Sequence, residues 1–339
     1  MNDVDVIVVG GGPVGLASAI EARLAGMTVA VIEPRESVID KACGEGLMPG
    51  AVPLLARLGV DPEGMPLRGV SYNTAARRAD HLFRTGTGRG VRRTTLHSAL
   101  LDRARELGVE RVTGRVESLR ADATGVSANG LTASWLFGAD GLHSSVRRLA
   151  GLERPAPRAR RRFGMTRHFA VAPWTDLIEI HWAPQAEVYV TPLAPDLVGV
   201  SILGAPRTDF DAVVAGIPSL AMRLAGLESS TGLKGAGPFR QRASRPSNGR
   251  VLLVGDASGY VDAITGEGLR LGFDQARLGV EHAQGSGSYD RDWARTTRDF
   301  RVLTSRLVLA ATTPLRAGIV PLASALPGVY GSVVEKLAR

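Results

Sequence analysis

Two short runs of apolar, largely β-branched residues occur near the start of the chain, at residues 5–9 (DVIVV) and 29–33 (VAVIE). Such runs are typical of buried β-strands. Between them, residues 13–24 place apolar side chains at helical spacing. A strand, a helix and a second strand in this order predict a βαβ unit with parallel strands.

The middle of the chain follows a different pattern. Residues 178–182, 187–191 and 198–203 form short alternating runs separated by proline-containing turns, which predicts an antiparallel sheet. Residues 251–254 (VLLV) then predict a buried strand that returns to the first domain, and residues 268–282 predict a helix. The whole pattern predicts a mixed α/β protein in which distant segments build one domain.

The composition is that of a folded globular protein. The 339 residues are 44% hydrophobic and 22% charged, which excludes intrinsic disorder and a membrane protein of several spans. The formal net charge is +8, and no aromatic residue is interleaved in the basic run of Arg158, Arg160, Arg161 and Arg162. We interpret this run as a solvated face and expect no nucleic-acid partner.

The cellular setting is indicated by two further features. Cys43 is the single cysteine, which excludes an internal disulfide and is typical of a reducing compartment. Residues 1–3 lack the basic start of a signal peptide, so we expect a cytoplasmic protein. The tail at residues 302–311 is largely apolar, and it would either pack on the core as a helix or lie on a membrane surface.

Gly10, Gly12 and Gly15 form a G-x-G-x-x-G motif between the first predicted strand and the first predicted helix. In this place the first glycine permits a tight turn, the second lets the backbone approach a pyrophosphate, and the third lets helix and strand pack closely. The N–H groups at the start of the helix would bind the phosphates. Glu33, at the end of the second strand, is placed to accept hydrogen bonds from an adenosine ribose. These residues predict a dinucleotide site.

Three further segments indicate which dinucleotide binds. Residues 93–97 (RTTLH), 138–147 (GADGLHSSVR) and 255–268 (GDASGYVDAITGEG) resemble fingerprints of the FAD-dependent enzymes that share the fold of para-hydroxybenzoate hydroxylase. That family includes aromatic hydroxylases, flavin halogenases and geranylgeranyl reductases. The resemblance implies that the cofactor is FAD.

The resemblance also implies roles for single residues. Asp256 would hold the ribityl chain, the turn at residues 266–268 would bring N–H groups to the isoalloxazine and the pyrophosphate, and Arg93 would lie near the cofactor. Arg92 is the alternative to Arg93 in register. The residues predicted to contact FAD lie in these motifs, after the second strand or in the segment that follows it: Gly10, Gly12, Pro13, Val14, Gly15, Glu33, Pro34, Arg35, Lys41, Cys43, Gly44, Arg93, Asp140, Gly141, Gly255, Asp256, Gly266, Glu267 and Gly268.

The same resemblance implies a three-layer Rossmann-like FAD-binding domain, a smaller antiparallel-sheet substrate domain and a C-terminal helical tail. We predict the FAD-binding domain at residues 1–65, 91–157 and 246–285, the substrate domain at residues 66–90 and 158–245, and the helical region at residues 286–339.

Two reactions fit this family. The strings at residues 93–97 and 138–147 are most similar to those of NAD(P)H-dependent monooxygenases, which hydroxylate or epoxidise hydrophobic or aromatic small molecules. Residues 41–46 (KACGEG) instead resemble the K-x-C-G-G segment of geranylgeranyl reductases, and residues 265–268 resemble their T-G-E-G string. Those enzymes reduce carbon–carbon double bonds of lipophilic substrates. Ala263 also stands where the family usually carries proline before the glycine turn, which is a departure from the family pattern at the face of the flavin that reacts with oxygen. We favour the monooxygenase and keep the reductase as the alternative.

The sequence identifies the source of electrons and the catalytic residues less closely than it identifies the cofactor. The sequence holds no second G-x-G-x-x-G motif, so NAD(P)H would visit the flavin transiently or a separate protein would deliver electrons. A flavin-binding protein without turnover is the alternative from another functional class. We name Cys43, His168, His181 and Tyr189 as candidates for catalysis or substrate contact, and no residues have the spacing of a metal site.

Overall fold

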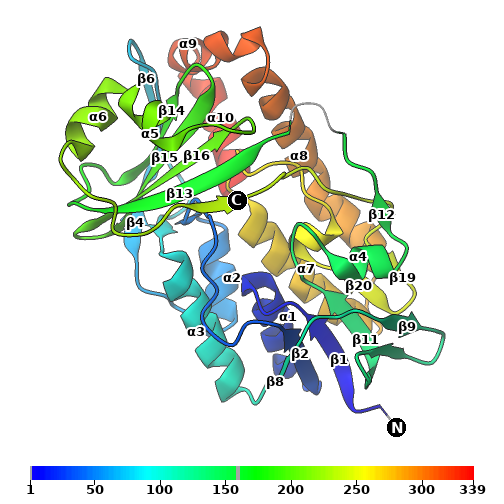
Figure 1. The fold of residues 1–339 in the computed structure, drawn as a ribbon. Helices are drawn as coiled ribbons and strands as arrows, with labels where there is room; N and C mark the ends of the chain where they lie inside the picture. The colour runs from blue at the N-terminus through cyan, green and yellow to red at the C-terminus, as the bar shows by residue number, and fades with distance from the viewer. Residues whose placement is uncertain (1, 158–160) are drawn as a thin grey trace.

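The computed structural model describes residues 2–157 and 161–339, and its two large sheets occupy the lower and upper parts of Figure 1. The lower one, which we call the parallel sheet, has the strand order β19-β20-β11-β1-β2-β8; β10 pairs antiparallel with β11, and β9 pairs antiparallel with β10. Its strands are β1 (Val4–Val9), β2 (Val29–Glu33), β8 (Glu110–Thr113), β9 (Leu119–Ala121), β10 (Val126–Ala128), β11 (Leu131–Gly138), β19 (Ser247–Asn248) and β20 (Val251–Leu253).

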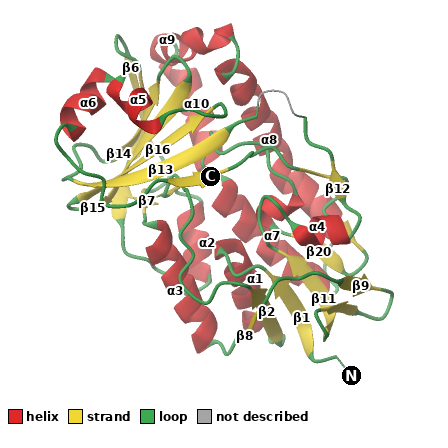
Figure 2. Ribbon diagram, viewed as in Figure 1, coloured by secondary structure: helices red, strands yellow, loops and turns green. Residues whose placement is uncertain are grey.

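Helices cover one face of the parallel sheet (Figure 2): α1 (Pro13–Leu24), α3 (Arg93–Glu106) and α7 (Gly268–Ala283). Val6 and Val8 of β1 are buried in the same apolar cluster as Leu16 and Ile20 of α1. Ile7, between the two valines, belongs to the cluster on the opposite face, because successive strand residues point to opposite sides. There β9, β10 and α4 (Ser145–Leu149) form a third layer. The predicted three-layer α/β fold is confirmed.

The upper sheet, which we call the antiparallel sheet, has the order β17-β13-β16-β15-β14-β5-β6. One neighbouring pair departs from the prediction, because β14 and β5 run parallel. Helices α5 (Phe210–Ala215) and α6 (Pro218–Leu224) cover one face of this sheet. Its strands are β5 (Gly69–Asn73), β6 (Arg78–Leu82), β13 (Phe163–Ala170), β14 (Leu177–Trp182), β15 (Ala186–Ala194), β16 (Leu197–Gly204) and β17 (Lys234–Ala236).

Shorter elements connect the two large sheets: α2 (Ala51–Arg57), β3 (Gly46–Leu47), β4 (Met65–Leu67), β7 (Gly88–Gly90), β12 (Glu153–Arg154), β18 (Arg242–Ala243) and the 3₁₀ turn η1 (Gly255–Ser258). Residues 66–90 contribute β5 and β6 to the antiparallel sheet, as a substrate-domain excursion requires. The predicted boundary at residue 158 lies outside the described residues, and the domain bounds stay a prediction.

The C-terminal helices run from the parallel sheet towards the antiparallel sheet (Figure 1). They are α8 (Tyr289–Ala311), the 3₁₀ turn η2 (Pro314–Gly318), α9 (Ile319–Ala325) and α10 (Pro327–Ala338). Within the described residues, no single helix is long and apolar enough to cross a bilayer. The pair Tyr289–Ala311 and Pro314–Ala325 meets the length and composition limits together, but it bends by 98°.

Buried charges join three distant parts of the fold. Glu187 of β15 is fully buried and pairs with both Arg162 and Arg316, and Arg162 Nε also donates to Asp262 Oδ2 at 3.0 Å. The interpretation of the basic run as a solvated face is therefore wrong for Arg162, which is only 6% exposed. A buried charge has to be paired, and here the partners lie far away in the sequence. Arg161 is exposed, and Arg158 and Arg160 lie outside the described residues.

We expect Glu187→Ala to lower the free energy of unfolding by about 3–5 kcal/mol, because Arg162 and Arg316 would lose a buried partner. Urea unfolding followed by circular dichroism measures the change. Asp102→Ala is the control, since Asp102 pairs with Arg105 at an exposed position and should cost less than about 1 kcal/mol. Equal losses in the two variants would contradict this account.

Candidate active site

A cavity of about 1100 Å³ lies between the glycine loop of the parallel sheet and the inner face of the antiparallel sheet. Sixteen of the nineteen residues predicted to contact FAD line it. The three that do not are Gly15, Gly255 and Glu267. The motifs identified along the chain therefore meet at one cavity.

The glycine loop has the shape that the motif predicts. Gly10 has φ +106°, and a Cβ atom there would come within 2.6 Å of the carbonyl oxygen of Ala139. A Cβ atom on Gly15 would lie 1.8 Å from the carbonyl oxygen of Gly10. At Gly12 the nearest atom would be Arg93 Nη2 at 4.0 Å, so this glycine leaves the start of α1 open to the cavity. No side chain caps α1, and its first N–H groups are available to a phosphate.

Glu33 lies at the adenosine end of this arrangement. Its Oε2 accepts the N–H of Gly11 at 2.7 Å, and its Oε1 accepts Arg35 Nε at 2.7 Å. Burial alone would raise the pKa of Glu33, but the hydrogen bonds from Arg35 and Gly11 outweigh it and hold the pKa below its usual value. The side chain is thus an ionised acceptor on the cavity wall, and it also fixes the glycine loop.

Charged groups converge on the cavity around Asp256. Burial raises the pKa of Asp256 to about 6, although the positive charges of Arg93, Lys41 and Arg147 oppose the rise. Among the described residues, Arg93 Nε and Asp140 Oδ1 are buried without a hydrogen-bond partner. Unpaired buried polar atoms are costly, and these two belong to residues that line the cavity. A bound group with a pyrophosphate and a polyol chain fits this wall, as FAD would.

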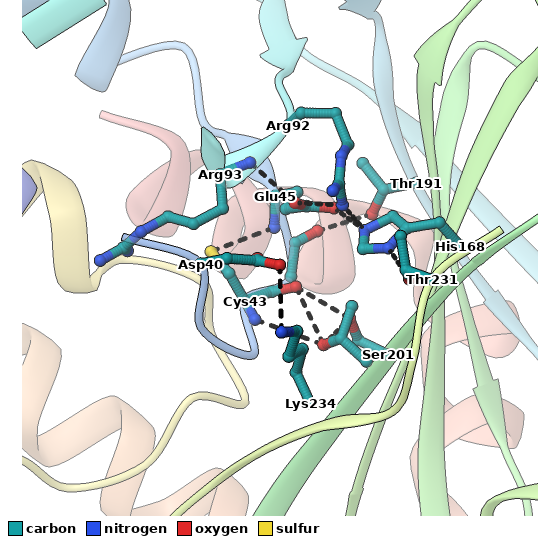
Figure 3. Close-up of polar contacts among 12 residues, drawn as sticks. Asp40, Cys43, Glu45, Arg92, Arg93, His168, Thr191, Ser201, Thr231 and Lys234 are labelled. Carbon is teal, nitrogen blue, oxygen red and sulfur yellow. Dashed lines mark hydrogen bonds and ion pairs between the residues drawn. The ribbon is translucent and has the colours of Figure 1, made fainter. Parts of the chain in front are cut away.

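Arg93 and Arg92 point in different directions in Figure 3. Arg93 lines the cavity, whereas Arg92 Nη1 donates to Glu45 Oε1 at 3.2 Å beside His168. Of the two arginines, Arg93 is therefore the one that can contact a bound cofactor. Arg92 instead contacts Glu45 and His168 behind the loop at residues 41–46.

Glu267 lies differently from the prediction. Its side chain is 1% exposed and pairs with Arg270 instead of lining the cavity. Burial raises the pKa of Glu267 to about 7, against the effect of Arg270. Its neighbours Gly266 and Gly268 do line the cavity, and Gly266 has φ +71° with open space beside it. The turn can therefore approach a flat ring through its backbone.

The four candidates for catalysis occupy three different places. Cys43 and Tyr189 line the cavity, and the Tyr189 hydroxyl donates to the carbonyl oxygen of Ile264 at 2.8 Å. His168 is buried one layer behind the cavity wall and contacts Glu45. His181 lies on the other face of the sheet, where its Nε2 is 3.3 Å from Glu179 Oε2. The structure thus keeps His181 away from the cavity.

The end of the cavity away from the glycine loop is largely apolar. Its lining comes from the antiparallel sheet and from the loops and helix α10 that face this sheet: Met48, Val70, Tyr72, Met165, Ile178, Ile180, Leu203, Phe239, Tyr260, Ile264, Val334 and Leu337. The sequence interpretation did not include Glu45, Tyr72 or Tyr260. Strand alternation places Ile178 and Ile180 on one face, and Ile180 pairs with Tyr189, but alternation alone does not show which face meets the cavity.

Comparison with known proteins also indicates an FAD site. A family model described as "FAD binding domain" matches residues 3–279. The chain belongs to this family. As a member of the FAD-binding family, related to para-hydroxybenzoate hydroxylase, it is an FAD-dependent oxidoreductase with FAD as its cofactor.

Relatives of this FAD-binding protein have different reactions in their names. A menaquinone reductase from Mycolicibacterium smegmatis is 30% identical over 91% of this chain and 85% of the relative. A 12-dehydrotetracycline 5-monooxygenase/anhydrotetracycline 6-monooxygenase from Streptomyces rimosus is 28% identical over 80% of this chain, which spans 61% of that relative. The structure of an anhydrotetracycline hydroxylase from Streptomyces rimosus superposes with a TM-score of 0.71 at 26% identity, covering 99% of this chain and 75% of that one.

We expect Asp256→Ala to weaken FAD binding about 10- to 100-fold, because hydroxyl groups would lose a charged acceptor worth about 1.5–3 kcal/mol. Quenching of FAD fluorescence on titration with apoprotein measures the dissociation constant. Undiminished affinity would remove Asp256 from the site.

The affinity should also depend on pH through Asp256. Its pKa of about 6 in the FAD-free protein means that binding is level above pH 6 and weakens below it, as the acceptor becomes protonated. The same titration between about pH 5 and 8 tests the prediction. Asp256→Asn should lose this dependence, and an unchanged slope in that variant would assign the titration to another group.

Proposed function

We propose that this protein is an NAD(P)H-dependent FAD monooxygenase that hydroxylates or epoxidises a hydrophobic or aromatic small molecule. The observation that carries the proposal is the single cavity that joins the FAD-binding loops to an apolar wall. Bound FAD would supply oxygen activation, and the chain would supply orientation and the exclusion of water.

The chemistry of the apolar wall supports this proposal. The hydroxyls of Thr166 and Ser201 face the cavity from the antiparallel sheet, but both donate to the carbonyl oxygen of Cys43. The Thr191 hydroxyl likewise donates to the carbonyl oxygen of Gly44. Since these hydroxyls are already bonded to the protein, the wall selects an apolar substrate and holds it by packing.

The delivery of electrons belongs to the same proposal. The sequence contains one G-x-G-x-x-G motif, and the cavity lined by two of its glycines, Gly10 and Gly12, is the one assigned to FAD. We therefore favour transient binding of NAD(P)H at the mouth of this cavity. A separate electron-donor protein is the alternative arrangement.

The second candidate function is reduction of a carbon–carbon double bond in an isoprenoid or other lipophilic substrate. Residues 41–46 favour it, because Cys43 and Gly44 of the segment that resembles K-x-C-G-G line the cavity. The menaquinone reductase also matches this chain over more of its own length than the tetracycline monooxygenase does.

Products distinguish the two reactions. The FAD-loaded protein is incubated with NAD(P)H, isotopically labelled dioxygen and a panel of alkylated phenols and polyprenyl quinones, and products are analysed by mass spectrometry. We expect a product with one labelled oxygen atom, the second being released as water. A product that gains two hydrogens without label would support the reductase, and hydrogen peroxide as the sole product would contradict both.

We also propose that the C-terminal helices contact the surface of a bilayer. Between residues 307 and 334 the only charged residue is Arg316, and its guanidinium is paired with Glu187. An uncharged segment of this kind fits the boundary between lipid headgroups and acyl chains better than a polar partner. Val334, which follows on α10, lines the apolar end of the cavity. Four large apolar residues in this segment are each at least 51% exposed: Leu315, Leu322, Leu326 and Val329.

Co-sedimentation with phospholipid vesicles tests this contact. We expect the double variant Leu315→Ser and Leu322→Ser to bind vesicles about tenfold more weakly, because two apolar side chains no longer leave water. Met222→Ser is the control, since Met222 is 76% exposed on α6, away from the C-terminal helices. Unchanged binding of the double variant, or a stable dimer that buries this segment, would contradict the proposal.

A further inference from the structure

Glu45 has a backbone conformation that is unfavourable for its residue type. Its φ is +57°, in the left-handed region, where a Cβ atom crowds the backbone and glycine is preferred. The K-x-C-G-G segment that residues 41–46 resemble has glycine at this position. Such a conformation persists only where the surrounding structure imposes it. The contacts of Glu45 should therefore show what imposes it.

The side chain of Glu45 is held from three directions (Figure 3). Its Oε1 accepts the backbone N–H of Arg93 at 2.7 Å and Arg92 Nη1 at 3.2 Å. Its Oε2 lies 2.6 Å from His168 Nε2, and both side chains are at most 3% exposed. His168 Nδ1 lies 2.7 Å from the Thr231 hydroxyl. His168 Nε2 also contacts Arg92 Nη1, so this nitrogen lies between a carboxylate that can only accept and a guanidinium that can only donate.

The same turn determines where Cys43 lies. The N–H of Glu45 donates to Cys43 Sγ at 3.4 Å. The carbonyl oxygen of Cys43 is held from the other side by Ser201 Oγ at 3.0 Å and Thr166 Oγ1 at 3.2 Å. The thiol is thereby kept on the cavity wall.

We propose that Glu45 and His168 are a positioning pair for the active site. Their contact holds the left-handed turn and so fixes the Cys43 thiol, while the Glu45 carboxylate anchors the start of α3, from which Arg93 reaches the cavity. The catalytic consequence rests on the flavin reaction proposed above. His168 does not line the cavity, and the Glu45 carboxylate is already bonded to Arg92, to the N–H of Arg93 and to His168, so the pair acts by positioning other residues.

A purely structural link between the loop and the sheet is the competing explanation. A glycine at residue 45 would adopt the same backbone without strain and without burying a charge. The carboxylate and the imidazole are instead placed directly behind the turn that carries the cavity residues Cys43 and Gly44. This placement is explained if the pair sets the orientation of those cavity residues.

The single cysteine gives a direct test. Because Cys43 is the only thiol in the chain, its rate of alkylation by iodoacetamide, followed by mass spectrometry and corrected for the thiol pKa found from the pH dependence of the rate, reports the order of this turn. In the FAD-loaded protein we expect Glu45→Gln and His168→Asn each to raise the rate roughly tenfold, because the turn opens more often when a hydrogen bond is lost. The visible absorption bands of bound FAD should shift in the same variants.

Asp40→Asn is the matched control. Asp40 lies just before the same loop and pairs with Lys234 at 3.4 Å in a partly exposed position, so its loss should leave the alkylation rate within about twofold of wild type. Glu45→Gly keeps the backbone conformation while removing the pair, so Cys43 should be alkylated as fast in Glu45→Gly as in Glu45→Gln. The glycine variant therefore still gives the test if Glu45→Gln folds poorly.

Wild-type alkylation rates and wild-type FAD bands in Glu45→Gly and His168→Asn would overturn the proposal. An equal rise in Asp40→Asn would also overturn it, because any loosening of the loop would then suffice. Neither measurement needs substrate turnover. A failure here therefore leaves the proposed reaction standing, and absence of an oxygenated product leaves the positioning pair standing.

Discussion

Polar contacts between the inner face of the antiparallel sheet and the loops of the parallel sheet set the width of the cavity. Tyr189 donates to the backbone of Ile264, and Arg162 pairs with Asp262 in the same loop. On the other side of the cavity, His168 contacts Glu45. The polar groups in these contacts are buried and need hydrogen-bond partners. Each contact therefore fixes the position of the loop to which it bonds. The remaining surface between the sheets is then free to be apolar.

This arrangement separates the chemistry of the cavity into two ends. Positive charge from Arg93 and Lys41 surrounds the glycine loop and Asp256, which suits a pyrophosphate and a polyol. Side chains such as Ile180 and Leu203 form the other end, which suits a molecule without charge. A flavin that spans the junction would meet its substrate in a place from which water is excluded.

Features that depend on short stretches of sequence could be predicted. The glycine loop, the first strands and helix, and the order of the motifs follow from local spacing, and the structure brings them together at one cavity. Contacts between distant segments could not be predicted in this way. Glu45 and His168 are 123 residues apart, and Arg162 belongs to a basic run that gives no sign of its buried partners.

The face of the antiparallel sheet that lines the cavity was equally hard to predict. Both faces are buried, one under α5 and α6 and the other against the cavity and the C-terminal helices. Polarity therefore does not distinguish His181, on the helix-covered face, from Tyr189, on the cavity face. Glu267 shows the same limit on a smaller scale, since Arg270, one turn along α7, draws its side chain out of the cavity.

The central claim is that FAD and substrate share this one cavity. A crystal structure of the FAD-loaded protein tests it most directly. The account predicts the adenosine end at Glu33, the ribityl chain at Asp256 and the isoalloxazine between Cys43 and the turn at Gly266, with its open side towards Tyr189. An isoalloxazine ring bound outside this junction, or one that fills the apolar end and leaves no room for a substrate, would contradict the account.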